Sequence, residues 1–152
     1  MSYNCEEIER DAQPVLSIRT ITSIQQLPQL LGESYKKIMQ YLGEQGETPA
    51  SAPFVGYFNL DMQNMDVEIG IPVAKKLPEK GNIEVSEIPA GKYASCIYTG
   101  PYDKIAPAYK DLTEWAEKNG YETSGIAYEL YLDDPGITTP EELKTQILFL
   151  LK

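Results

Sequence analysis

The chain of 152 residues contains no histidine and only two cysteines. The absence of histidine removes the most common metal ligand and the usual general base of enzymes. Cys5 and Cys96 lie far apart in the sequence and form neither a CxxC pair nor a zinc-binding spacing. We therefore predict no metal site and no cofactor, and we interpret both cysteines as free thiols of a reducing compartment.

Basic residues are also scarce, with 13 lysines and arginines against 23 acidic residues and a net charge of −10. Direct nucleic-acid binding needs a basic surface, so we expect none, and anionic membrane surfaces are disfavoured for the same reason. No apolar run approaches the ~20 residues of a membrane span, and the acidic N-terminus lacks the pattern of a signal peptide. These features predict a cytoplasmic protein.

Tyrosine is abundant, with eleven residues beside three phenylalanines and one tryptophan. Tyrosine combines an apolar ring with a polar hydroxyl, so a chain rich in it can line a pocket that is apolar and still forms hydrogen bonds. The alternative is that these tyrosines are half-buried strand residues, because strands favour tyrosine in any case. Composition does not decide between the two interpretations.

Hydrophobic periodicity predicts an α+β chain that follows an acidic N-terminal lead-in at residues 1–13. Pro28 is placed in the first turn of one helix, Asp103 is a candidate N-cap of another, and Gly46 and Gly120 are candidate helix stops. The predicted helices cover residues 25–45 and 103–119, and the predicted strands cover residues 15–24, 54–60, 66–73, 83–88, 92–99, 126–132 and 144–152.

The two halves of this domain, residues 14–152, repeat each other. Gly46 matches Gly120 at a spacing of 74 (120 − 46), and Tyr57 matches Tyr128 at a spacing of 71 (128 − 57). We therefore predict two pseudo-symmetric strand–helix–strand–strand repeats, at about residues 14–73 and 83–152, with antiparallel sheets. Each helix covers one sheet face, and the remaining faces are expected to border a central ligand cleft.

Strand alternation indicates which side chains face this cleft. Odd positions of residues 66–73 are apolar and are assigned to the helix side, which places Glu68 on the other side. The small Ala94 and Cys96 suit close packing under a helix, so Tyr93 is assigned to the cleft. In residues 126–132, the face that carries Glu129 and Tyr131 is assigned to the cleft. The predicted ligand-binding residues are therefore Glu129, Tyr131, Tyr93, Phe58 and Glu68.

Several segments together resemble a known family. They include residues 66–73 (DVEIGIPV), 87–94 (EIPAGKYA), 100–103 (GPYD) and 128–135 (YELYLDDP). Their order resembles the gyrase-inhibitor-like small-molecule-binding domain, which is also the effector-binding module of bacterial AraC-type and MerR-type transcription activators. The resemblance implies a two-repeat fold with a central ligand cleft, in which Glu129 matches a pocket glutamate used for cationic, lipophilic ligands.

The expected function is binding of amphipathic, cationic small molecules by a stand-alone module, because the activators' helix-turn-helix domain has no counterpart in this sequence. Glu129 would anchor the charge, and aromatic rings would add cation–π attraction. Whether the protein is an enzyme is left open: the sequence offers no catalytic set, so hydrolysis of reactive xenobiotics in the same cleft ranks below binding. A protein-inhibitor role, with a protein partner or as a homodimer, is a further alternative.

Overall fold

The computed structural model describes residues 3–59, 61 and 63–152, and the chain divides into two compact units. Unit 1 comprises residues 1–10 and 90–152, and unit 2 comprises residues 11–89. No helix among the described residues is long and apolar enough to cross a membrane. The α+β class with antiparallel sheets, predicted from the sequence, is confirmed.

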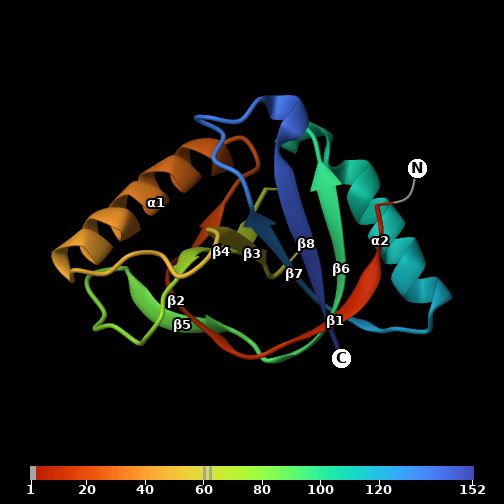
Figure 1. Ribbon diagram of the computed structural model, residues 1–152, viewed down its shortest axis with the longest axis horizontal. Helices are drawn as coiled ribbons and strands as arrows, with labels where there is room; N and C mark the ends of the chain where they lie inside the picture. The colour runs from red at the N-terminus through yellow and green to blue at the C-terminus, as the bar shows by residue number, and fades with distance from the viewer. Residues whose placement is uncertain (1–2, 60, 62) are drawn as a thin grey trace. The chain divides into compact units, whose positions relative to one another are not determined.

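Unit 2 packs one helix on one antiparallel sheet. The sheet order is β3-β4-β2-β5, and α1 lies against the face formed by β2 and β4 (Figure 1). The core of the unit contains Leu16 and Ile71 from the sheet and Ile38 and Leu42 from the helix. The elements are β2 (Gln13–Thr22), α1 (Leu27–Glu44), β3 (Phe54–Tyr57), β4 (Met65–Pro72) and β5 (Glu84–Ile88).

Unit 1 has the same plan, with α2 packed on a sheet of order β1-β6-β8-β7. Its core contains Ala94 and Ile147 from the sheet and Ala108 and Leu112 from the helix. Small alanines let α2 lie close to β6. The elements are β1 (Glu6–Arg10), β6 (Gly91–Thr99), the 3-10 turn η1 (Tyr102–Lys104), α2 (Ala106–Lys118), β7 (Thr123–Tyr131), η2 (Pro140–Glu142) and β8 (Lys144–Leu151).

The strand–helix–strand–strand order is present in both units, as β2-α1-β3-β4 and β6-α2-β7-β8. Each unit also gains a strand that the sequence analysis placed elsewhere. The lead-in predicted at residues 1–13 is wrong for residues 6–10, which form β1 and pair with β6. Residues 84–88, predicted as part of the second repeat, form β5 and pair with β2 of unit 2. A short polar edge strand carries a weak hydrophobic pattern, which explains the first error. In the second case the strand itself was predicted, and only its partner was assigned to the wrong unit.

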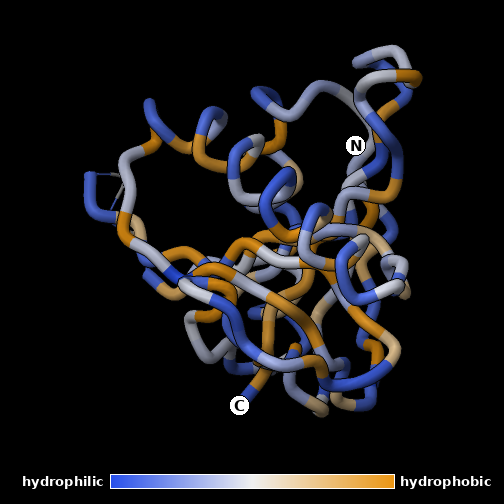
Figure 2. Tube along the Cα trace, turned by 90° about the vertical axis from the view of Figure 1, so that its left-hand side faces the viewer, coloured by the Kyte–Doolittle hydropathy of each residue, from blue (hydrophilic) through white to orange (hydrophobic). Residues whose placement is uncertain are grey.

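The helix limits follow local backbone chemistry. Pro28 lies in the first turn of α1, and Gly46 and Gly120 adopt positive φ angles of 69° and 79° just beyond the two helices, as predicted. The prediction of Asp103 as an N-cap is wrong, because Asp103 lies in η1 and α2 begins after Ile105 without a side-chain cap. Each helix buries residues of one face only, and the coiled turns in Figure 2 carry both hydrophobic and hydrophilic colours.

The strand predicted at residues 54–60 ends at Tyr57, and residue 60 lies outside the described residues. Phe58 still continues the antiparallel contact, since its backbone N–H donates to the carbonyl of Asp66. The odd positions of β4 face α1, as predicted, because Ile71 of β4 and Val73, just after the strand, belong to the core that contains α1 residues.

Candidate functional site

Glu129 lies on the sheet face of unit 1 that α2 covers. The register pairs Glu129 with Ile147 and Ala127 with Phe149, and Ile147 and Phe149 belong to the core beneath α2. Directly paired residues of antiparallel strands share a face. Glu129 therefore occupies a sheet position that normally holds an apolar core side chain.

The other unit shows what that core side chain would be. The repeat also matches residues 67–69 with residues 145–147, at a spacing of 78 (145 − 67), so Ile69 corresponds to Ile147. Val55 is paired with Ile69, as Glu129 is paired with Ile147. Val55 is therefore the structural counterpart of Glu129, and it is fully buried. The match of Tyr57 with Tyr128 would instead relate Phe58 to Glu129, but Phe58, which follows Tyr57, lies on the sheet face away from α1, whereas Glu129 lies on the face that α2 covers. Unit 1 thus carries a carboxylate where unit 2 carries an apolar core residue.

Two tyrosines hold the carboxylate. Tyr109, from α2, donates a short hydrogen bond from its hydroxyl to Oε2 of Glu129. Tyr131, two residues further along β7, donates to Oε1 at 2.9 Å. Each oxygen of the carboxylate therefore accepts one phenolic hydrogen bond. One donor comes from α2 and the other from β7, and together they fix the orientation of the carboxylate plane.

Glu129 as a whole residue is partly exposed, and the partial burial of its carboxyl group dominates the electrostatics. Desolvation raises the pKa of Glu129 above its ordinary value, although the hydrogen bonds from Tyr109 and Tyr131 act in the opposite direction. Desolvation disfavours the charged form of a carboxyl group, while donors to the carboxylate favour it. The net rise means that the ionised group is less stable here than in water, so a bound cation would relieve an existing cost.

Further aromatic and acidic groups adjoin the pair. The ring of Tyr102, in η1, meets that of Tyr131 edge-on, with centroids 5.3 Å apart, and 36% of Tyr102 is exposed. Burial raises the pKa of the Tyr102 hydroxyl, and the negative charges of Asp133, Asp134 and Glu129 raise it further. The surroundings of Glu129 therefore combine aromatic rings with negative potential, an environment that favours organic cations.

Tyr93 is not part of this arrangement. It is paired with Leu150 and lies on the opposite face of the sheet from Ala94 and Cys96, as expected, but Glu129 lies on their face. Tyr93 is fully buried, and its ring meets that of Tyr128 at 6.4 Å between centroids. The prediction that Tyr93 and Glu129 share a face is therefore wrong. The assignment failed because Glu129 was placed on the cleft face, away from the helix, whereas its neighbour Ala127 packs under α2.

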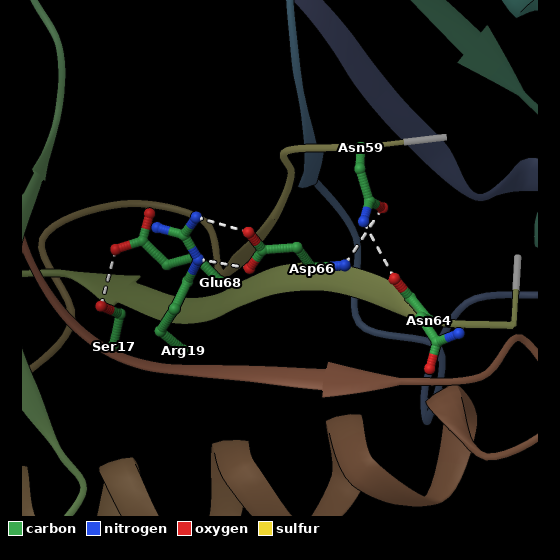
Figure 3. A network of polar contacts seen from close by, with 6 residues as sticks. All are labelled: Ser17, Arg19, Asn59, Asn64, Asp66 and Glu68. Atoms are coloured by element: carbon green, nitrogen blue, oxygen red, sulfur yellow. Dashed lines mark hydrogen bonds and ion pairs between the residues drawn. The ribbon is translucent and has the colours of Figure 1, made fainter. Parts of the chain in front are cut away.

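Glu68 and Phe58 belong to unit 2, on the sheet face away from α1. Glu68 is 5% exposed and accepts a hydrogen bond of 2.7 Å from the hydroxyl of Ser17 (Figure 3). The Arg19 guanidinium lies over the Phe58 ring, 3.8 Å from its centroid, and binds both carboxylate oxygens of Asp66. The hydrogen bond from Arg19 lowers the pKa of Asp66.

This network of unit 2 is well connected within itself. Asn59 accepts from the backbone N–H of Asp66 and donates to the carbonyl of Asn64 (Figure 3). A protein cation therefore already occupies the face of Phe58, and a ligand cation would have to compete with Arg19 there. The roles predicted for Glu68 and Phe58 in ligand binding stay predictions, and Glu129 and Tyr131 are the predicted residues that the structure brings into direct contact.

The sequence analysis selected neither Tyr109 nor Tyr102 as a ligand-binding residue. The ring of Tyr109 contacts Phe149, as expected for an apolar position of a helix, but its hydroxyl reaches Glu129. The available signal is Tyr35, which matches Tyr109 at the same spacing of 74 (109 − 35) that relates Gly46 to Gly120. The hydroxyl of Tyr35 also crosses from helix to sheet and donates to the carbonyl of Phe54 at 2.8 Å. Among the described residues, no cluster of acidic or cysteine side chains is arranged to hold a metal ion.

Comparison with known proteins assigns the family. The model of the GyrI-like small molecule binding domain matches residues 3–152, so the chain belongs to this family. The C-terminal domain of EcmrR superposes with a TM-score of 0.82 and 29% identity, covering 100% of this chain and 99% of that domain. EcmrR in its DNA complex superposes with a TM-score of 0.87 and 29% identity, again over the whole chain. No curated protein matches the sequence.

The chain spans only 58% of the EcmrR chain in that DNA complex. More distant structures share the fold alone. A hydrolase from Listeria innocua has a TM-score of 0.72 and 14% identity, with 99% of this chain and 93% of that chain covered. SAV2435, solved bound to tetraphenylphosphonium, has a TM-score of 0.65 and 14% identity, with 98% and 94% covered.

Proposed function

We propose that the protein binds amphipathic organic cations at Glu129, with Tyr109, Tyr131 and Tyr102 as the aromatic surroundings. The observation that carries the proposal is the desolvated carboxylate, whose two oxygens are held by two phenols. Membership of a small-molecule-binding family supports a ligand at this kind of site. A cytoplasmic location of the chain stays a prediction.

The charge of the ligand follows from the charge of the site. An ionised carboxylate in a poorly solvated position attracts a cation more strongly than the same group in water, because the effective dielectric constant is lower. A large, weakly hydrated cation loses little hydration on entering such a site, whereas a small inorganic cation loses much more. The aromatic rings add cation–π attraction of about 0.5–2 kcal/mol.

A pair of ions with the same shape and opposite charge tests this proposal. Tetraphenylphosphonium and tetraphenylborate present the same four phenyl rings around a cationic or an anionic centre. We expect calorimetry to show micromolar binding of the phosphonium and at least tenfold weaker binding of the borate. Equal affinity for the two ions would show that the aromatic rings alone govern binding, and it would contradict the role of Glu129 as the anchor of the cation.

The affinity for the phosphonium is expected to depend on pH. Because a bound cation favours the ionised carboxyl group, the affinity is complete above the raised pKa of Glu129 and is lost as the pH falls through it. The decline approaches about tenfold per pH unit where ionisation is obligatory. Titrations between neutral and mildly acidic pH would measure this change, and affinity that stays constant over the range would contradict it.

One observation favours a second candidate function, hydrolysis of a reactive ligand at the same site. General-acid catalysis by a glutamate near neutral pH requires a raised pKa, and Glu129 has one. Incubation with strained cyclopropane compounds in ¹⁸O-labelled water would test this function by mass spectrometry. Incorporation of ¹⁸O that depends on Glu129 would support turnover, and unchanged compounds would leave binding as the function.

A further inference from the structure

The sheet register of unit 1 brings the two cysteines together. Strand β1 pairs with β6 so that Glu6 lies opposite Ser95 and Glu7 opposite Ala94. One step further along the same register, Cys5 lies opposite Cys96. Opposite residues of antiparallel strands have Cα atoms about 4.5–5.5 Å apart, which lies within the range that a disulfide bond spans.

The two side chains also point to the same side. Cys96 is 1% exposed in the core beneath α2, and Cys5 is partly buried against that core. The thiols are close enough to hydrogen-bond to each other. Asp111, on α2, fixes the N-terminal segment above them, because its Oδ2 accepts from the backbone N–H of Tyr3 at 3.3 Å and from Sγ of Cys5 at 3.7 Å.

We propose that Cys5 and Cys96 form a reversible cross-strand disulfide when the protein meets a small-molecule disulfide oxidant. The bond would close unit 1 covalently. Unit 1 is discontinuous, since β1 is separated from the rest of the unit by residues 11–89. The disulfide would bridge a loop of 91 residues (96 − 5), and constraining so long a loop in the unfolded chain stabilises the folded state.

Oxidised glutathione supplies the oxidising equivalents. The Cys5 thiol loses its proton to solvent, and the thiolate attacks one sulfur of glutathione disulfide, which releases one glutathione thiolate. The Cys96 thiol then loses its proton and attacks Sγ of Cys5, which releases the second glutathione. Two protein thiols are oxidised to one disulfide, and one glutathione disulfide is reduced to two thiols.

The surroundings make this reaction slow at neutral pH. Burial raises the pKa of Cys96 to about 12, and burial followed by the charge of Asp111 raises the pKa of Cys5. Because the thiolate is the attacking species, Cys5 is the first nucleophile, as it is the more exposed thiol. The rate is expected to rise by up to about tenfold per pH unit below the pKa of Cys5.

Oxidation of the purified chain tests the proposal. After incubation with oxidised glutathione, we expect a monomer that has lost two hydrogens and both titratable thiols, with a melting temperature raised by about 4–8 °C and restored by dithiothreitol. Cys5→Ser, at the less buried position, should show no change of melting temperature. Two unreacted thiols, a lasting glutathione adduct on Cys5, or a disulfide-linked dimer would each overturn the proposal.

Asp111→Asn provides a second test that keeps both cysteines in place. The amide oxygen can still accept from the backbone of Tyr3, but the negative charge beside Cys5 is removed. We expect the variant to form the same disulfide about threefold to tenfold faster, because a larger fraction of Cys5 is thiolate. Unchanged or slower oxidation would contradict the placement of Asp111 against the attacking thiol.

Discussion

Glu129→Gln is expected to weaken binding of tetraphenylphosphonium by roughly 30- to 150-fold. Removing one partner of a desolvated charge pair costs about 2–3 kcal/mol at the low end of measured cases, and each 1.4 kcal/mol is a factor of ten in Kd. Glutamine keeps the size of the side chain and an oxygen that accepts from Tyr109 or Tyr131. Isothermal calorimetry on the two proteins measures the difference directly.

Two controls separate the site from the overall charge of the protein. Glu114→Gln makes the same change on an exposed position of α2 and should leave the affinity within about twofold, because exposed charges are well screened. Tetraphenylborate should bind Glu129→Gln at least as well as the wild type. Equal losses in both variants, or none in Glu129→Gln, would contradict the role of Glu129.

The folded state of Glu129→Gln should be at least as stable as that of the wild type. A carboxyl group whose pKa is raised on folding destabilises the folded protein at pH values above that pKa, and the neutral amide avoids this cost. A melting curve therefore shows whether lost binding reflects lost charge or lost structure.

Gly70→Ala is expected to destabilise the protein by about 2–3 kcal/mol, through overpacking of the unit 2 sheet. A Cβ atom at position 70 would lie 2.8 Å from the carbonyl oxygen of Leu16 and 2.8 Å from two atoms of the Phe54 ring. Phe54 is fully buried and β4 is bordered by β2 and β3, so neither neighbour moves freely. Urea unfolding of the two proteins measures the difference.

Gly32→Ala is the matched control for this substitution. Gly32 lies within α1 and is exposed, and apart from its chain neighbours and the nearby helix backbone no atom lies within 4 Å of an added Cβ. Alanine should stabilise the helix by about 0.5–1 kcal/mol, because glycine loses more backbone entropy on folding. If both substitutions had the same sign, the steric explanation for Gly70 would be contradicted.

Strong periodicity made most of the fold predictable. The predicted helix at residues 25–45 is observed as Leu27–Glu44, and the predicted strand at residues 66–73 is observed as Met65–Pro72. Both segments bury one apolar face, which leaves a clear pattern in the sequence. Gly46 and Gly120 also predicted where the two helices end, because glycine readily adopts the positive φ angle found just beyond a helix. This signal does not depend on burial.

The edge strand β1 was missed because it is short and charged, and β5 was predicted as a strand but assigned to the wrong unit. Each of these strands pairs with a strand that is far away in the sequence or in the other repeat. An alternating pattern of only a few residues does not indicate which strand it pairs with. The contact between Cys5 and Cys96 was missed for the same reason, since it depends on the register of β1 against β6.

The candidate site was predicted in part. The sequence selected Glu129 and Tyr131, which lie in contact, but it placed Tyr93 with them, and the register places Tyr93 on the other face. Alternation assigns residues to two faces and does not say which face a helix covers. A glutamate at a core position breaks the rule that polar residues mark the solvent side, and such exceptions are expected at functional sites.

Direct measurement of the Glu129 titration tests the central claim, that this carboxylate anchors a cation. Carbon-13 NMR of the side-chain carboxyl, assigned with Glu129→Gln, would follow its pKa in the free protein and with saturating tetraphenylphosphonium. The account predicts a raised pKa in the free protein and a clear decrease when the cation is bound. A pKa that is the same with and without the bound cation would contradict it.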